Sequence, residues 1–365
     1  MANSLDRLFQ ILVDQGGSDL HLTEGYPPKL RIHGGVHPIE GEPPLDAETI
    51  NDYLSGICEP AAYKIFLEEG DLDFAYEMNE TSRFRCNFLK QQFGLGAVFR
   101  LIPTKIATLE QLGIPDVVKN FAKIRAGLVL VTGPTGSGKS TTLAALIDYI
   151  NENFNKHIIT VEEPIEFVHN NKQCVITQRE VPTNCASFSD GLRASLREDA
   201  EIVLVGEMRD LETIELALTS AETGMLVFGT LHTNNAVKTI DRIIDVFPSS
   251  QQAQVRTMLS VSIQGVVAQL LMKRCDKEGR IAVNEIMFTT PAVAAIIREG
   301  KTAKLNDVIT QGKDMGMQFM DEAIWELLQQ GKVSPQEAYL KAIDKGRFKN
   351  FLPAEDAGLA NSAGA

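Results

Sequence analysis

The segment G-P-T-G-S-G-K-S at residues 133–140 constrains the fold of this chain more than any other feature. It satisfies the pattern G-x-x-x-x-G-K-[S/T], and it lies between an apolar run at 127–132 and a helix-like stretch at 141–150. An ordinary glycine-rich turn between a strand and a helix is the alternative, but such a turn does not require the Lys139–Ser140 pair. We therefore expect a nucleotide-binding loop in an α/β sheet.

The residues of this loop have separate parts in binding a nucleoside triphosphate. Glycines allow successive backbone N–H groups to turn toward the α and β phosphates at the positive end of a helix. Lys139 is expected to reach the β and γ oxygens, and Ser140 to hold Mg²⁺. The expected cofactors are thus ATP and Mg²⁺. The expected contacts are Gly133, Pro134, Thr135, Gly136, Ser137, Gly138, Lys139 and Ser140.

Phosphoryl transfer to water also needs a group that orients or deprotonates the water, and a carboxylate near the metal. Glu207 follows the apolar run at 201–206, so we expect it at the C-terminal end of a parallel strand, beside the phosphate site. We predict that Glu207 is the general base and a metal ligand. The alternative is that its carboxylate caps a helix beginning near Asp210.

A second acidic site follows the strand-like run at 157–161. Glu162, Glu163 and Glu166 lie in one loop, where Pro164 ends the strand. These carboxylates could hold Mg²⁺ or position the attacking water, with Glu163 as the first choice for catalysis. A solvated acidic loop is the alternative, because adjacent acidic residues are common in loops.

Thr230 and His232 close a fourth strand-like run, so both are expected to point toward the same crevice as γ-phosphate sensors. A hydrogen-bonded core histidine is the alternative for His232. Ring ATPases also draw on cations from a neighbouring chain. The candidates here are Arg85, Arg100, Arg193 and Arg197. Each of them could instead form a surface ion pair of little energetic value.

Apolar periodicity divides the chain into an N-terminal α+β region and a doubly wound α/β region. Helical spacing at residues 5–12 predicts a first helix, and alternation at 19–23, 29–32 and 83–88 predicts strands. From Gly127, buried runs alternate with helix-like stretches, as in a mostly parallel sheet. We expect an N-terminal domain at 1–105, a linker at 106–117, an ATPase core at 118–290, a helical subregion at 291–350 and a disordered tail at 351–365.

Composition narrows the possible partners. Among the 365 residues, 35 Lys and Arg against 48 Asp and Glu give a net charge of −13, which disfavours nucleic acid as the main partner. The five cysteines form no C-x-x-C pair, which argues against a zinc ribbon and favours a reducing compartment. No apolar run approaches the ~18 residues of a membrane-spanning helix. We therefore expect no direct membrane insertion, and membrane association only through a partner protein.

Four segments in a fixed order identify a family resemblance. The sequences GPTGSGKST at 133–141, EEPIE at 162–166, LVGEMRDLETI at 204–214 and TGMLVFGTLHTN at 223–234 resemble the PilT family of secretion-type ATPases. By this resemblance, Gly133 to Thr141 form the Walker A motif, so Thr141 joins the nucleotide contacts, and Gly206–Glu207 end the Walker B motif. The other two segments would be the acidic box and the histidine box. Arg85 and Arg100 match N-domain arginines that approach nucleotide in a ring.

The resemblance implies a PAS-like N-terminal domain, a RecA-like P-loop ATPase domain and a homohexamer. It implies a motor that powers type IV pilus retraction during twitching motility. The implied location is the cytoplasmic side of the inner membrane, through a pilus platform protein. The segment at 315–321 is similar to an accessory retraction ATPase of the family, so a paralogous pilus ATPase is a further expected partner.

Two segments depart from the family pattern. Met225 stands where the histidine box usually has its first histidine, while His232 is present. A C-terminal stretch at 292–299 lacks an arginine and an asparagine of the family pattern. Three other functions stay open. The first is an ATP-binding adapter of another pilus motor. The second is an extension or secretion ATPase, although such ATPases often carry a four-cysteine zinc insert that is missing here. The third is a DNA translocase, which the net charge disfavours.

Overall fold

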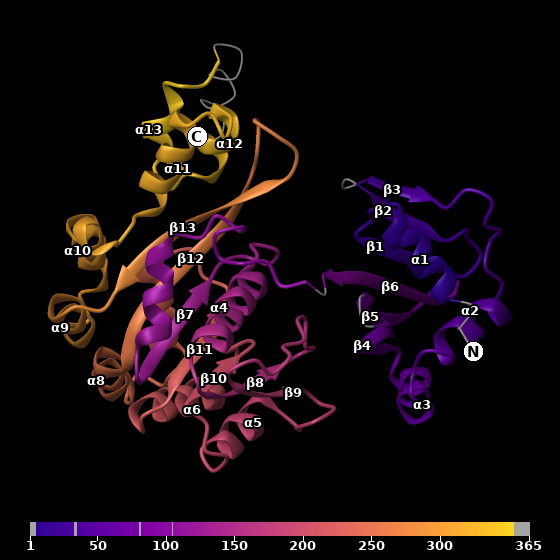
Figure 1. The fold of residues 1–365 in the computed structure, drawn as a ribbon, viewed down its shortest axis with the longest axis horizontal. Coiled ribbons are helices and arrows are strands. Elements are labelled where there is room, and N and C mark those ends of the chain that lie inside the picture. The colour runs from indigo at the N-terminus through magenta and orange to yellow at the C-terminus, as the bar shows by residue number, and fades with distance from the viewer. Residues whose placement is uncertain (1–4, 33–34, 80–81, 104, 354–365) are drawn as a thin grey trace. The chain divides into compact units, whose positions relative to one another are not determined.

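The computed structural model describes residues 5–32, 35–79, 82–103 and 105–353 (Figure 1). These residues divide into two compact units. Unit 1 consists of residues 1–106 together with 164–168, and unit 2 of 107–163 together with 169–365. The predicted mixed α/β class is confirmed, with one sheet of six strands and one of seven.

Unit 1 is a six-stranded antiparallel sheet covered by helices. Its strands follow the order β3-β2-β1-β6-β5-β4. Alternation along β5 buries Phe84, Cys86 and Phe88 against the helices and leaves Arg83 and Arg85 on the other face. The helices are α1 (Asp6–Asp14), α2 (Ala47–Ser55) and α3 (Pro60–Glu69), and the strands are β1 (Asp19–Thr23), β2 (Lys29–Ile32), β3 (Gly35–Pro38), β4 (Asp71–Asn79), β5 (Ser82–Gln91) and β6 (Gly94–Pro103).

Unit 2 is built on a seven-stranded sheet in the order β13-β12-β7-β11-β10-β8-β9. All neighbours are parallel except β12 and β13, which form an antiparallel hairpin at one edge. The strands are β7 (Gly127–Thr132), β8 (His157–Glu162), β9 (Val175–Glu180), β10 (Ile202–Val205), β11 (Leu226–Leu231), β12 (Ile263–Lys273) and β13 (Arg280–Phe288). The helical segments among them are η1 (Asp116–Lys123), α4 (Lys139–Asn153), α5 (Phe188–Ser195), α6 (Leu211–Glu222), α7 (Ala236–Asp245) and α8 (Gln252–Ser262).

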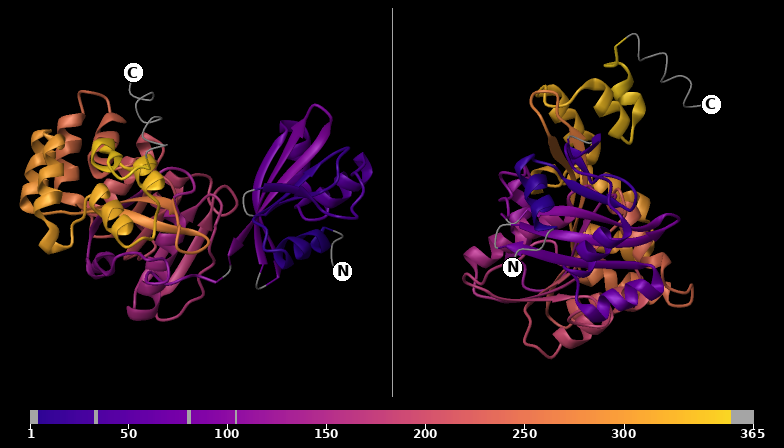
Figure 2. Two further views of the ribbon diagram at one scale, coloured as in Figure 1. Left: turned by 90° about the horizontal axis from the view of Figure 1, so that it is seen from above. Right: turned by 90° about the vertical axis from the view of Figure 1, so that its right-hand side faces the viewer.

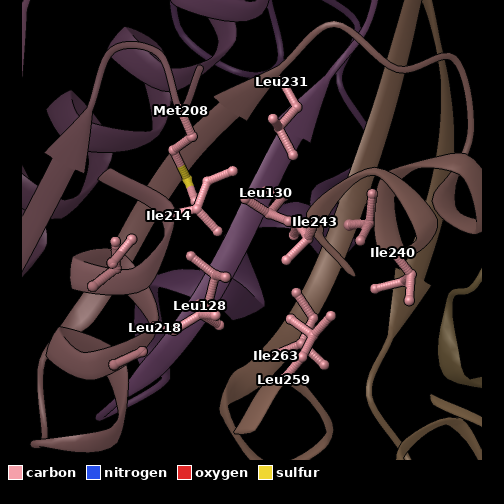
Figure 3. Packing of buried hydrophobic residues seen from close by; sticks show 14 of the residues in the cluster. Leu128, Leu130, Met208, Ile214, Leu218, Leu231, Ile240, Ile243, Leu259 and Ile263 are labelled. Carbon is pink, nitrogen blue, oxygen red and sulfur yellow. The ribbon is translucent and has the colours of Figure 1, made fainter. Parts of the chain in front are cut away.

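Two apolar cores cover the two faces of this sheet. Because side chains alternate along a strand, Leu128 and Leu130 of β7 point to one face, and Val129 and Val131 to the other. The first face packs against α6, α7 and α8, as Figure 3 shows for Ile214, Ile240 and Leu259. The second packs against α4 and η1. Helices on both faces explain why the central strands β7, β10 and β11 are buried along their whole length and almost entirely apolar.

The β12–β13 hairpin was not predicted as such. The apolar run at 265–272 is too short to span a membrane, and it forms most of β12. The hairpin reaches toward the C-terminal helices (Figures 1 and 2). These helices pack on Met272, Ile281 and Val283. These elements are α9 (Pro291–Glu299), η2 (Thr302–Lys304), α10 (Leu305–Gln311), η3 (Lys313–Met315), α11 (Met320–Gln329), α12 (Pro335–Lys341) and α13 (Lys345–Lys349), of which α11–α13 contact the hairpin.

The region after Pro291 is helical, as its spacing predicts. Met317 precedes α11 and packs in the central core with Leu305 and Ile309 of α10. The ring centroids of Phe351 and Trp325 are 4.8 Å apart. Residues 354–365 of the expected tail lie outside the described residues.

Candidate active site

The turn between β7 and α4 has a backbone that only glycine adopts readily. Gly136 and Gly138 have φ angles of +75° and +85°, and Gly133 has +149°. A Cβ atom at Gly133 would lie 2.2 Å from the carbonyl oxygen of Gln269 on β12. All three glycines are therefore needed for their conformations, and Gly133 is also needed for its close approach to β12. α4 then begins at Lys139, so its first N–H groups face the turn.

The polar groups of the turn fit a phosphate ligand. The Lys139 ammonium donates to the carbonyl oxygens of Gly133, at 2.8 Å, and Pro134, at 3.2 Å. The Ser137 hydroxyl is buried, and no partner for it is found among the residues that the structure describes. Pro134, Thr135, Gly136 and Ser140 are exposed. A helix N-terminus, a lysine held at the loop and an orphaned hydroxyl together form an anion-binding cradle.

Glu207 lies two residues beyond β10 and is held by two partners. Its Oε2 is 2.6 Å from Nη2 of Arg209, and its Oε1 is 3.0 Å from Nε2 of His232. Burial acts to raise the pKa of Glu207, but the hydrogen bonds and charges of Arg209 and His232 outweigh it and hold that pKa below its usual value. In return, the hydrogen bond to Glu207 raises the pKa of Arg209. Glu207 is therefore an ionised, oriented carboxylate at neutral pH.

The capping alternative for Glu207 is wrong. Helix α6 is capped by Asp210, whose carboxylate accepts the backbone N–H of Thr213 at 2.8 Å. Glu207 therefore does not cap α6. The end of its strand, β10, is held by a backbone hydrogen bond. Gly206 donates its N–H to the carbonyl oxygen of Val161, at 2.8 Å, which aligns the ends of β10 and β8.

The three carboxylates of the 162–166 loop have different surroundings. Glu162 accepts hydrogen bonds from Thr160 Oγ1, at 2.7 Å, and from Gln178 Nε2, at 3.2 Å. Glu163 is 3.8 Å from the Arg209 guanidinium, so Arg209 lies between Glu163 and Glu207. Glu166 is grouped with unit 1, where its Oε1 is 3.9 Å from Nη1 of Arg85. The carboxylates are thus ion-paired or hydrogen-bonded, which the solvated-loop alternative does not require.

Thr230 and His232 come from the end of β11, which lies between β7 and β10. The Thr230 hydroxyl donates to the carbonyl oxygen of Gly206 at 2.5 Å, and this hydrogen bond joins the end of β11 to the end of β10. The His232 ring contacts Glu207 through its Nε2 atom. Met225, at the start of β11, is buried in the core beside α6 and α7. The apolar side chain of Met225 fits this buried position.

The four predicted arginines lie in three places. Arg85 and Arg100 face each other across β5 and β6 of unit 1, and Arg100 donates to the buried Asp19 at 2.8 Å. Two like charges in direct cross-strand register repel each other. Arg193 on α5 pairs with Asp190 at 3.1 Å and with Glu212 at 2.5 Å. Arg197 is exposed just after α5.

Sequence reasoning missed two polar residues of this region. The available signal for Arg209 is its position two residues after the candidate base Glu207. Gln269 was hidden inside the apolar run at 265–272, where one amide among aliphatic residues is the signal. Within the described residues, no group of three or more His, Cys, Asp or Glu side chains is arranged to hold a metal ion by itself.

Comparison with known proteins supplies the family. Residues 67–340 match the model of the type II/IV secretion system proteins. The chain is 49% identical to the type IV pilus retraction ATPase PilT of Pseudomonas aeruginosa, covering 93% of this chain and 98% of that protein. It is 47% identical to a twitching motility protein of Neisseria gonorrhoeae, covering 86% and 84%.

A crystal structure of the pilus retraction motor PilT with bound ADP matches with a TM-score of 0.86 and 40% identity, covering 93% of this chain and 97% of that one. The similarity therefore extends over both units and is not confined to the glycine-rich turn. No helix among the described residues is long and apolar enough to cross a bilayer.

Proposed function

From the premise that this chain belongs to the type II/IV secretion system protein family, as a PilT-like pilus retraction ATPase, we propose that it is a homohexameric motor driven by Mg-ATP hydrolysis. The motor would withdraw pilin subunits and so power twitching motility. The observation that carries the proposal is the shared sheet edge of β7, β11 and β10, which bear the phosphate cradle, His232 and Glu207 in turn. Parallel strands end at one edge, which is where such sheets bind ligands.

The loop residues would hold the nucleotide. The N–H groups of Gly136, Ser137 and Gly138 and the start of α4 would receive the phosphates, and Lys139 would move from the Gly133 and Pro134 carbonyls to the β and γ oxygens. Ser140 and Thr141 follow at the first turn of α4, where the exposed Ser140 hydroxyl would hold Mg²⁺. Bound Mg²⁺ neutralises phosphate charge as the reaction proceeds.

The carboxylates would act on the metal and on water. Mg²⁺ usually keeps several waters and needs only one or two protein carboxylates. Glu207 and Glu163 would therefore suffice as its protein carboxylates, with Glu162 in an outer position. Glu207 would orient the attacking water and accept its proton, because the ion pair with Arg209 keeps it ionised. His232 would sense the γ-phosphate through its contact with Glu207, and Thr230 would keep β11 aligned with β10.

In a ring of subunits, arginines of a neighbouring chain would supply the remaining positive charges at the nucleotide. Arg85 and Arg100 lie opposite each other on β5 and β6, so two guanidinium groups could be offered together to a neighbouring subunit's nucleotide. Arg193 and Arg197 are the second pair of candidates. In the cell the motor would be cytoplasmic, where ATP is available, and held at the inner membrane by a pilus platform protein. A paralogous pilus ATPase is a further partner that we propose.

Steady-state ATP hydrolysis by the purified chain, measured over a range of protein concentrations, tests the proposal. We expect the turnover per chain to rise with assembly, and to vanish in Glu207→Ala and in Lys139→Ala while both variants stay folded. No turnover at any concentration would leave an ATP-binding adapter as the better description. Near wild-type turnover in Glu207→Ala would remove Glu207 from its role as the base.

A further inference from the structure

The side chain of Gln269 enters the phosphate loop from the neighbouring strand β12. Its Nε2 donates to the carbonyl oxygen of Ser137 at 2.7 Å, and its Oε1 accepts from the Thr142 hydroxyl on α4 at 2.8 Å. Gln269 is 2% exposed and Thr142 is 1% exposed. The amide thus joins the tip of the loop to the first turn of the helix behind it. Buried amides of this kind are held by their hydrogen bonds, because an unpaired polar group is costly there.

The bond to Ser137 fixes the orientation of a whole peptide unit. In a trans peptide, the C=O of one residue and the N–H of the next point in opposite directions. Holding the Ser137 carbonyl toward Gln269 therefore turns the Gly138 N–H away from β12 and into the turn. Gly138 is the residue before Lys139, so this N–H is among the donors that a phosphate would meet.

Asn284 on the adjacent strand β13 determines which way the Gln269 amide faces. Asn284 Nδ2 donates to Oε1 of Gln269 at 3.0 Å, and Asn284 is itself 2% exposed. With Oε1 facing two donors, from Asn284 and Thr142, Nε2 is left to face Ser137. A rotated amide would place two oxygens against each other at Ser137. Space is also tight, because a Cβ at Gly138 would lie 3.0 Å from Nε2 of Gln269.

We propose that Gln269, oriented by Asn284, is a positioning residue that aims the Gly138 N–H at the nucleotide phosphates. This inference rests on the proposed ATPase function and adds to it a residue on β12, outside the glycine-rich motif. Gln269 touches neither substrate nor metal in this account. It acts through the Ser137–Gly138 peptide unit, which would otherwise be free to turn.

The test uses MgATP hydrolysis by the full-length chain and two variants. Gln269→Met keeps the volume and removes the N–H donor. Asn284→Asp leaves the loop untouched, but it replaces a donor with an acceptor and so favours the rotated amide. Because the Gly138 N–H would contact phosphate in both the ground state and the transition state, we expect KM for MgATP to rise about tenfold or more in each variant, with kcat within about twofold.

The KM-against-kcat split separates positioning from mere stability. A variant that is only less stable has fewer active molecules, which lowers apparent kcat and leaves KM unchanged. Asn151→Leu is the matched control, since Asn151 is a fully buried amide at the other end of α4 that bonds Asn170 and Lys172. We expect it to lower the melting temperature without raising KM.

Each outcome gives a clear answer. A wild-type chain that neither binds nor hydrolyses MgATP contradicts the proposed function itself. A wild-type chain that hydrolyses MgATP, with an unchanged KM in folded Gln269→Met and Asn284→Asp, overturns the positioning role alone. If Gln269→Met does not fold, the Asn284→Asp result decides, because that variant keeps the Gln269 side chain in place.

Discussion

The phosphate-loop side of the candidate site and its carboxylate side are held in place by different forces. On the loop side, Gln269, Asn284 and Thr142 are almost fully buried and joined by neutral hydrogen bonds. On the carboxylate side, Glu207 and Arg209 are joined by an ion pair, with the Arg209 side chain 64% exposed. Buried neutral networks are rigid and costly to break, whereas exposed ion pairs are weak and screened by salt.

This difference separates two requirements of one reaction. A phosphate cradle has to be preorganised before the nucleotide arrives. A base and the cations around it can be reoriented during a catalytic cycle, since exchanging exposed ion pairs costs little energy. The following predictions test whether the two sides behave as differently as they are built, from the largest expected effect to the smallest.

Removal of the base on the carboxylate side should have the largest effect. Glu207→Gln keeps the shape of the side chain but can no longer accept a proton, so we expect kcat to fall by about 10²–10⁴-fold. The melting temperature should change little, because the ion pair that is lost is partly exposed. Glu212→Gln is the control, as it removes a carboxylate that pairs with Arg193 on the surface. Equal losses in both variants would contradict the assignment.

The second prediction concerns a buried carboxylate next to Asn284 in the sequence. Glu285 on β13 is 1% exposed and accepts the backbone N–H groups of Ala236, at 2.8 Å, and Met320, at 3.3 Å. Burial raises the pKa of Glu285 to about 7, despite those hydrogen bonds. A folded-state pKa above the unfolded value gives stability that is present below pH ~4.5 and is lost as the pH rises through ~7.

Measured by urea unfolding between pH 5 and 8, the wild type should therefore lose stability relative to Glu285→Gln as the pH rises. The full shift corresponds to roughly 3 kcal/mol. Glu207, whose pKa is lowered, should give the opposite sign, with stability lost as the pH falls. Parallel pH curves for the wild type and Glu285→Gln would mean that Glu285 is ionised in the folded chain at neutral pH.

The third prediction concerns the cation that holds the base. Arg209→Ala removes the guanidinium that lowers the pKa of Glu207. The pKa of Glu207 then rises, and because the reaction needs its ionised form, the acid limb of the kcat/KM profile should move to higher pH. Arg209→Lys retains the charge and should keep most of the wild-type profile. An acid limb that stays in place in Arg209→Ala would assign that limb to another group.

The smallest effect is expected for the surface arginine on α5. Arg193→Ala removes ion pairs to Asp190 and Glu212 that are about half exposed, so the free energy of unfolding should change by less than about 1 kcal/mol. Chemical denaturation measures this change, and Glu212→Ala should match it. If ATP hydrolysis in the assembled ring falls strongly only in Arg193→Ala, the arginine also acts on a neighbouring nucleotide. If both variants are fully active, its role is structural.

Much of the fold could be predicted from local patterns. Strands β7, β8, β10 and β11 are short apolar runs, and the residues that follow them, such as Glu207, lie near one another because parallel strands end at the same edge. The β12–β13 hairpin escaped prediction because its apolar run fits a strand, a buried helix or a loop core equally well. Its pairing with β7 is a long-range contact that no local pattern encodes.

The contacts between residues of the candidate site were harder to predict than the candidate residues themselves. Arg209 was missed because ion pairing depends on where side chains point after the strand ends. Gln269 is 132 positions from Ser137, so its hydrogen bond follows only from the order of strands in the sheet. The role of Thr230 in joining β11 to β10 likewise depends on strand order, since Gly206 is brought beside it by the sheet.

The β12–β13 hairpin contributes to three apolar clusters. Its first half packs in the cores on the two faces of the central sheet, through residues such as Val266 and Val267. Met272, Ile281 and Val283 belong to a separate cluster with α11, α12 and α13. A segment with its own small core is a natural unit of local unfolding. Amide hydrogen exchange should therefore show α11–α13 opening together, before the central sheet does, which makes the chain's last helices a cooperative unit attached through one hairpin.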